Sequence, residues 1–259
     1  MIKDKLFKLF LVIKTIRNFP TAFLDILSLL RGEVLYNIRG KNIMFYSRAN
    51  TEDIAEIVMV ASGREYALSN IASLPKRPVI VDVGGHIGTF SISIAKILKN
   101  KCRVITFEPD KENYDLLLKN IKLNKVNSVS PKNIAISDYV GKGYLHTEKM
   151  NTDAYFLDQS RKGYNCQVST LVGEMGLKRI KKINILKMDI EGGEYKIFSD
   201  KKSLNYILKN VHYFFLEYHN IDRINNYARI QRIIEDNFRV LDKHGVTLLL
   251  ENLHWEGKK

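Results

Sequence analysis

The feature that most constrains the fold is an alternation of short apolar segments with stretches of helical spacing. The clearest example is the apolar segment 79–83, which is followed by an expected helix over 87–98 and a second apolar segment over 103–107. Strands that are apolar throughout are buried on both faces, as in parallel sheets that helices cover on both sides. The sequence therefore predicts an α/β fold with a mainly parallel sheet.

The same alternation continues to the end of the chain. We expect further strands over 133–136, 183–190, 211–218, 238–241 and 246–250, and further helices over 110–124, 195–208 and 221–236. Ligands of such sheets bind outside the carboxyl ends of the strands. Most of the polar residues discussed below follow these strand ends, which predicts a binding site there.

The N-terminal part of the chain has a different pattern. Apolar residues recur at helical spacing over 2–16 with lysines between them, and Pro20 is expected to end or kink this helix. A second apolar stripe continues to residue 30, and 34–46 is typical of a hairpin with a polar turn. Helices are then expected from Thr51 and over 64–74. We predict a helical and hairpin extension over 1–48 and a main domain over 49–259.

The chain is basic, with a formal net charge of +13. Residues 1–48 contain nine Lys or Arg and three Asp or Glu, which places +6 in this part. A basic balance favours acidic partners such as nucleic acid, anionic lipid or a phosphorylated substrate, although many basic proteins bind none of these. The basic amphipathic pattern over 1–31 is compatible with a membrane surface, with packing on the same protein, or with a second copy in a homodimer.

Cysteine content and hydropathy indicate a cytoplasmic protein, either free or peripheral to a membrane. Cys102 and Cys166 lie far apart and form no CxxC pair, so neither a structural zinc site nor a disulfide framework is expected. The longest uncharged run, Val83–Ala95, has 13 residues, whereas a spanning helix needs about 20. Lys14 interrupts the N-terminal apolar run, which leaves too short a core for a signal peptide.

A glycine-containing loop joins the strand at 79–83 to the following helix. It has the pattern D-x-G-x-x-x-G, formed by Asp82, Gly84 and Gly88. The dinucleotide fingerprint G-x-G-x-x-G is absent, because His86 and Thr89 stand where it requires glycine. No pyrophosphate needs to be cradled in S-adenosylmethionine, and the acid at the strand end suits the ammonium group of that cofactor. The loop therefore favours S-adenosylmethionine over a nicotinamide dinucleotide.

A second acidic residue, Glu108, ends the next predicted strand. It lies 20 residues after Gly88. A carboxylate at this place can accept hydrogen bonds from both hydroxyls of a ribose. We therefore predict that Glu108 binds the ribose of the cofactor.

Four blocks in order resemble the FkbM-type methyltransferases: 82–88, 107–109, 133–138 and 187–194. The last block, Lys-Met-Asp-Ile-Glu-Gly-Gly-Glu, is the most specific, and the resemblance covers roughly residues 50–220. It implies a class I methyltransferase Rossmann-like fold with a seven-stranded sheet. It also implies S-adenosylmethionine as the cofactor and hydroxyls of sugars, glycolipids or secondary metabolites as acceptors. One departure is Gly85-His86, which replaces the usual Ala-Asn pair.

The resemblance and the loop together give a set of cofactor-binding residues. The loop provides most of them, the next strand provides the ribose acid, and the segment 135–138 is expected near the adenine. The predicted set is Asp82, Gly84, Gly85, His86, Gly88, Glu108, Ala135, Ser137, Asp138 and Asp189.

Transfer of a methyl group to an alcohol also needs a group that takes the hydroxyl proton. Candidates lie at the ends of two strands: Asp189 at the end of the strand over 183–190, and Glu217 and His219 at the end of the strand that begins at 211. His219 is the preferred base because the ordinary pKa of histidine lies near neutrality. Alternatively, Asp189, Glu191 and Glu217 could bind Mg²⁺ through hard oxygen ligands, and this interpretation is not preferred.

Three rival functions remain open. An RNA 2′-O-methyltransferase would suit the positive charge and a Lys187, Asp189 and Glu217 set, although no RNA-binding module is recognised. A non-catalytic binding protein could retain the same fold. A nicotinamide oxidoreductase is disfavoured by the mismatches in the glycine loop.

Overall fold

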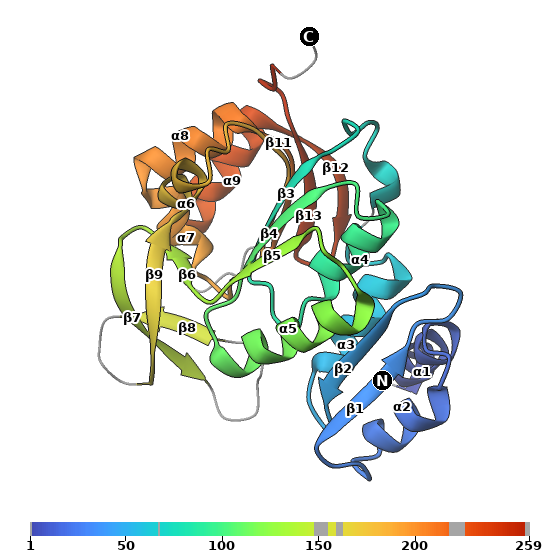
Figure 1. The fold of residues 1–259 in the computed structure, drawn as a ribbon. Helices are drawn as coiled ribbons and strands as arrows, with labels where there is room; N and C mark the ends of the chain where they lie inside the picture. Colours follow the sequence, from blue (N-terminus) through green and yellow to red (C-terminus); the bar gives the residue numbers. More distant parts are fainter. Residues whose placement is uncertain (1, 67, 148–154, 159–162, 218–225, 257–259) are drawn as a thin grey trace.

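The computed structural model describes residues 2–66, 68–147, 155–158, 163–217 and 226–256. Its centre is a seven-stranded sheet of order β12-β13-β11-β10-β3-β4-β5, in which β13 is the only antiparallel strand (Figure 1). The predicted α/β fold with a mainly parallel seven-stranded sheet is confirmed. The strands are β3 (Val79–Val83), β4 (Arg103–Phe107), β5 (Val129–Lys132), β10 (Ile183–Met188), β11 (Val211–Glu217), β12 (Phe238–His244) and β13 (Thr247–Asn252).

Helices cover both faces of this sheet, as predicted. Alternate strand residues point to opposite faces, so Ile80 packs in one apolar cluster and Val81 in another. The first cluster lies under α3 (Asp53–Ser62), α4 (Thr89–Ile97) and α5 (Lys111–Asn124). The second lies under α6 (Leu171–Leu177), α7 (Glu194–Ser199), α8 (Lys201–Asn210) and α9 (Asn226–Asn237).

The N-terminal part forms two helices and a hairpin, as its sequence pattern indicates. These are α1 (Ile2–Thr15), α2 (Phe19–Ile26), β1 (Glu33–Asn37) and β2 (Met44–Arg48). Pro20 lies in the first turn of α2, where its missing N–H costs nothing. The first apolar cluster contains residues of α1 and the hairpin together with residues of β3 and α4, so the extension shares a core with the main domain.

One asparagine pair joins the hairpin to α5. The side-chain amide of Asn124 accepts from the backbone N–H of Met44 at 2.9 Å and donates to its carbonyl at 2.6 Å. Asn120 makes the same pair of bonds with Tyr46, at 2.7 and 3.0 Å. Residues at i and i+4 lie on one face of a helix. Thus α5 bonds to β2 much as a neighbouring strand would.

Three expectations about local structure are wrong. The helix expected over 64–74 is reduced, in the described residues, to the single 3₁₀ turn η1 (Leu68–Asn70). The strand expected over 133–136 belongs to a second sheet of order β6-β9-β7-β8, and the unpredicted β5 is the outer strand of the main sheet. The strand expected to run to 190 ends at Met188. The second sheet contains β6 (Ala135–Ser137), β7 (Gly141–Thr147), β8 (Tyr155–Asp158) and β9 (Tyr164–Thr170).

None of the helices in the described part of the chain has both the length and the apolar character that a membrane span needs.

Candidate active site

A row of polar side chains crosses the centre of the sheet. The strand register places Lys187 of β10 beside Asp82 of β3, and Asp82 beside Thr106 of β4. The Asp82 carboxylate is fully buried and accepts from Ser91 Oγ at 2.6 Å and from Thr106 Oγ1 at 3.2 Å. Its other oxygen lies 3.6 Å from Lys187 Nζ. Burial raises the pKa of Asp82, against the opposing effect of the Lys187 charge.

The same lysine supports the glycine loop. Lys187 Nζ donates to the carbonyl of Gly84 at 2.6 Å. Gly84 has a φ of +86°, and a Cβ there would lie 1.9 Å from the backbone oxygen of Asp189. Only glycine fits both this conformation and this close approach. The loop is therefore held against the end of β10 by a geometry that excludes side chains.

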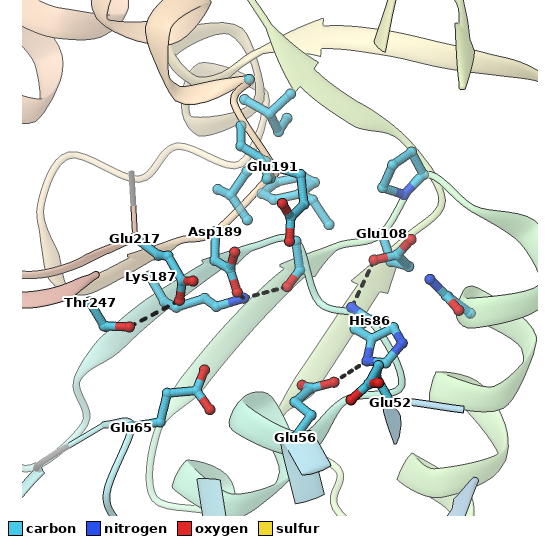
Figure 2. A pocket seen from close by; sticks show the side chains of 18 of the residues that line it. Glu52, Glu56, Glu65, His86, Glu108, Lys187, Asp189, Glu191, Glu217 and Thr247 are labelled. Atoms are coloured by element: carbon cyan, nitrogen blue, oxygen red, sulfur yellow. Dashed lines mark hydrogen bonds and ion pairs between the residues drawn. The ribbon is translucent and has the colours of Figure 1, made fainter. Parts of the chain in front are cut away.

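A cavity of about 390 Å³ opens at the carboxyl ends of the central strands (Figure 2). This volume lies within the usual range of small-molecule sites. The walls come from α3, from the ends of β3, β4, β10 and β11, from β6 and from the turn between β12 and β13. The position agrees with the expectation that ligands bind outside the carboxyl ends of parallel strands.

At one end of the cavity lies Glu108, which backbone groups hold in place. Its two carboxylate oxygens accept from the N–H of His86 at 2.7 Å and from the N–H of Asp110 at 2.9 Å. Burial raises its pKa to about 7, against the opposing effect of the charged His86. The apolar residues Phe107, Ile134 and Ala135 line the wall beside it. A carboxylate next to an apolar wall suits a ribose joined to a flat base.

His86 links this end of the cavity to α3. Its Nδ1 contacts Glu56, and its Nε2 lies 3.3 Å from Asp53 Oδ1. Burial lowers the pKa of His86, but the two carboxylates raise it, and the net pKa lies well above its ordinary value. Arg48 forms an ion pair with Asp53 at 2.8 Å. The ring of His86 is therefore engaged by protein groups, and its backbone N–H serves Glu108.

At the other end of the cavity, three carboxylates converge. Oxygens of Glu65, Asp189 and Glu217 all lie within 4.8 Å of one another. Lys187 Nζ lies 3.4 Å from Asp189, and Glu217 accepts from Thr247 Oγ1 at 2.9 Å. Figure 2 shows Glu65 directed toward this group from the segment after α3. Burial, together with the charges of Glu56 and Asp189, raises the pKa of Glu65 to about 8.

The structure brings together many of the residues predicted from the sequence. Gly84, His86, Glu108, Ala135 and Asp189 line the cavity, and so do two further predicted acids, Glu191 and Glu217. Alternation along the strand predicted over 183–190 would have placed Asp189 and Glu191 on the same side, but β10 ends at Met188, so alternation does not apply to them. His219 lies outside the described residues.

The other predicted residues in the described part of the chain do not line the cavity. Asp82 faces α4, where it supports the loop. A Cβ on Gly85 would lie 2.1 Å from Thr106 Oγ1, and one on Gly88 would lie 2.5 Å from Leu117. Ser137 Oγ bonds to Asp138 at 3.0 Å. Their contact with a cofactor stays a prediction.

Sequence reasoning missed the contribution of α3 and of the segment after it. Glu56 and Glu65 line the cavity but belong to no recognised motif. Glu56 could have been noticed as an acid within the otherwise apolar helix over 53–62. Glu65 lay in a segment that was wrongly expected to be helical. The group of possible metal ligands also differs from the predicted one, because Glu65 rather than Glu191 lies close to Asp189 and Glu217.

Comparison with known proteins finds a matching family. The methyltransferase FkbM domain family matches residues 82–240 of this chain, which is more than half of its length. This range contains the glycine loop, Glu108, Lys187, Asp189 and Glu217.

Two curated relatives are methyltransferases. Methyltransferase 1 of Beauveria bassiana is 23% identical over 150 residues, which are 49% of this chain and 60% of the relative. Methyltransferase sdnD of Sordaria araneosa is 40% identical over 55 residues, which are 21% of each chain. The matched part therefore spans less than two thirds of either relative.

Solved structures show likeness in fold. A fibrillarin/Nop5p complex is similar with a TM-score of 0.45 and 14% identity, covering 74% of this chain and 79% of that one. TYW2 from M. jannaschii, solved in complex with AdoMet, gives a TM-score of 0.39 and 16% identity, covering 86% and 88%.

Proposed function

The chain belongs to the methyltransferase FkbM domain family, and from this premise we propose that it transfers a methyl group from S-adenosylmethionine to a hydroxyl oxygen. The acceptor would be a sugar, a glycan or glycolipid, or a secondary metabolite. The observation that carries the proposal is the division of one cavity into a nucleoside-binding end at Glu108 and a carboxylate-rich end at Glu65, Asp189 and Glu217.

The Glu108 end offers the hydrogen-bond acceptor and the apolar wall that would suit S-adenosylmethionine. Each oxygen of Glu108 uses one lone pair for a backbone N–H and keeps another for a ribose hydroxyl. The apolar wall at Phe107, Ile134 and Ala135 would contact the adenine. When bound, this cofactor would supply a methyl group activated by a positively charged sulfur leaving group.

The carboxylate-rich end would orient and deprotonate the acceptor. A base is effective when its pKa lies near the working pH. Glu65 meets this condition with a pKa of about 8, and its oxygen lies close to those of Asp189 and Glu217. We therefore add Glu65 to the predicted candidates for the base. Lys187 compensates the negative charge of Asp189 from the side of the sheet.

Titration calorimetry with S-adenosylmethionine tests the cofactor site. Glu108→Ala should weaken binding about a hundredfold, because two hydrogen bonds to a charged acceptor are lost. Glu112→Ala is the matched control, since Glu112 is an exposed acid on α5 close to Glu108 in sequence. Equal affinity in wild type and Glu108→Ala would remove Glu108 from the site.

Transfer of a labelled methyl group to a panel of hydroxyl and amine acceptors tests the reaction itself. The expected product carries the label on oxygen, and label found only on nitrogen would contradict O-methylation.

Chelation by EDTA tests the metal alternative in the same assay. We expect no loss of activity, whereas a loss that Mg²⁺ restores would assign the carboxylates to a metal.

A further inference from the structure

The outer surface of the N-terminal helices is apolar. Along α2, the exposed side chains Phe19, Phe23, Ile26 and Leu27 recur at i, i+4, i+7 and i+8, so they lie on one face. The opposite face carries the buried Ala22 and Asp25. A surface helix ordinarily turns polar residues outward. Here the outward face is the apolar one.

The neighbouring helix continues this surface. Phe10 and Ile13 of α1 are exposed, while Leu11 and Val12 are buried in the core. Leu24 and Leu29 add two further exposed apolar side chains after Phe23. Contiguous exposed apolar surface marks an interaction site, whereas single exposed apolar residues do not. We call this surface the N-terminal apolar face; it consists of Phe10, Ile13, Phe19, Phe23, Leu24, Ile26, Leu27 and Leu29.

Among residues 9–32, the exposed charges have one sign. Lys14, Arg17 and Arg31 are exposed within the same segment. Asp25 is the only acid among residues 9–32, and it is buried, where it accepts from Tyr36 and from the backbone N–H of Asn50. Within residues 9–32 the surface therefore combines exposed apolar groups and cations with no exposed carboxylate.

We propose that the N-terminal apolar face binds the surface of an anionic lipid membrane. Apolar side chains on short surface helices insert at the boundary of headgroups and acyl chains, and adjacent cations contact anionic headgroups. Figure 1 shows α1 and α2 at the periphery of the molecule, beside the β1–β2 hairpin, where a flat surface can reach them.

A second copy of the chain fits this surface less well. A two-fold interface pairs each patch with its own copy. The patch that contains Lys14, Arg17 and Arg31 would then face the same cationic patch of the partner, and like charges repel. An anionic lipid surface complements these cations.

Cosedimentation with vesicles tests the proposal on the full chain. The protein should pellet with vesicles of phosphatidylcholine containing phosphatidylglycerol, and much less with pure phosphatidylcholine. Phe23→Ser/Leu27→Ser should weaken binding at least tenfold. Leu177→Ser/Val140→Ser is the matched control, because these side chains are 80% and 75% exposed but lie elsewhere.

A separate double variant tests the cations beside the N-terminal apolar face. Lys14→Ala/Arg17→Ala should weaken binding to anionic vesicles about thirtyfold, and high salt should reduce wild-type binding in the same direction. Lys201→Ala/Lys202→Ala, on exposed lysines of α8, should leave it unchanged. Circular dichroism of each variant separates loss of binding from loss of folding.

Several results would overturn the proposal. They are no pelleting of the wild type, equal pelleting with neutral vesicles, and unchanged binding by the folded Phe23→Ser/Leu27→Ser variant. A lipid-free dimer that this variant converts to a monomer, without vesicle binding, would assign the face to a second copy instead.

Discussion

The two ends of the cavity are built in different ways. Glu108 is held by backbone N–H groups of His86 and Asp110, both within 22 residues of it. The carboxylates at the other end come from three separate segments, and side chains hold them: Lys187 at Asp189 and Thr247 at Glu217. Backbone groups fix a position whatever the neighbouring side chains are. The Glu108 end is therefore suited to a cofactor that does not vary. At the carboxylate-rich end, the side chains can change with the acceptor.

Lys187 is the group that connects both ends, and its loss should have the largest effect. Lys187→Met leaves the buried Asp82 without its cation and the Gly84 carbonyl without its donor. Removing one partner of a buried ion pair costs about 3–5 kcal/mol. Urea unfolding should show this decrease in the free energy of unfolding.

A matched pair of variants checks the cause. Lys202→Met changes an exposed lysine and should be close to neutral. Lys187→Met/Asp82→Asn should recover part of the lost stability, because no buried charge is left unpaired. Additive losses in the double variant would mean that the pair does not act as a unit.

The second prediction concerns only the carboxylate-rich end. Glu65→Gln should lower kcat about a hundredfold, the lower range for a general base, with little change in cofactor affinity. In the wild type, kcat should rise with pH up to about 8 as Glu65 loses its proton, and the variant should lose this rise.

The control for this substitution is Glu256→Gln, which changes an exposed acid near the end of the described chain. If the dependence of kcat on pH keeps its shape in Glu65→Gln, the base is not Glu65, and Asp189, Glu217 or His219 becomes the candidate.

The third prediction concerns only the Glu108 end of the cavity and is the smallest. Glu108 accepts hydrogen bonds fully only when ionised, and its pKa lies at about 7. Cofactor affinity should therefore be about tenfold weaker at pH 6 than at pH 8. Calorimetry at both pH values measures the ratio, and Glu108→Gln should make the affinity independent of pH.

This contrast also explains what the sequence could predict. The glycine loop and Glu108 lie in one strand–loop–helix–strand unit, so local pattern alone brought them together. The parallel sheet could also be predicted from local pattern, because its strands are continuously apolar in sequence. Glu65 has no such context, because its place depends on how α3 packs against α4 and where the chain turns after Gly63. Tertiary contacts of this kind leave no periodic signal.

The second sheet was missed for a related reason. Its strand β6 pairs with β9, in which the partner residues lie 33 positions further along the chain, as Ala135 and Val168 do, and the sequence between the strands has weak alternation. Partner choice over such a separation is not encoded by either strand alone. The strand expected over 133–136 was therefore assigned to the wrong sheet.

The asparagine pair on α5 has a consequence for association between chains. A strand with free N–H and C=O groups along one side is a template on which another polypeptide can add. On β2, the outward N–H groups of Met44, Tyr46 and Arg48 are taken by side-chain oxygens of Asn124, Asn120 and Asp53. An incoming strand would have to displace one of these side-chain oxygens for each N–H group that it bonds. This border of the hairpin is thereby closed to fibril-like growth.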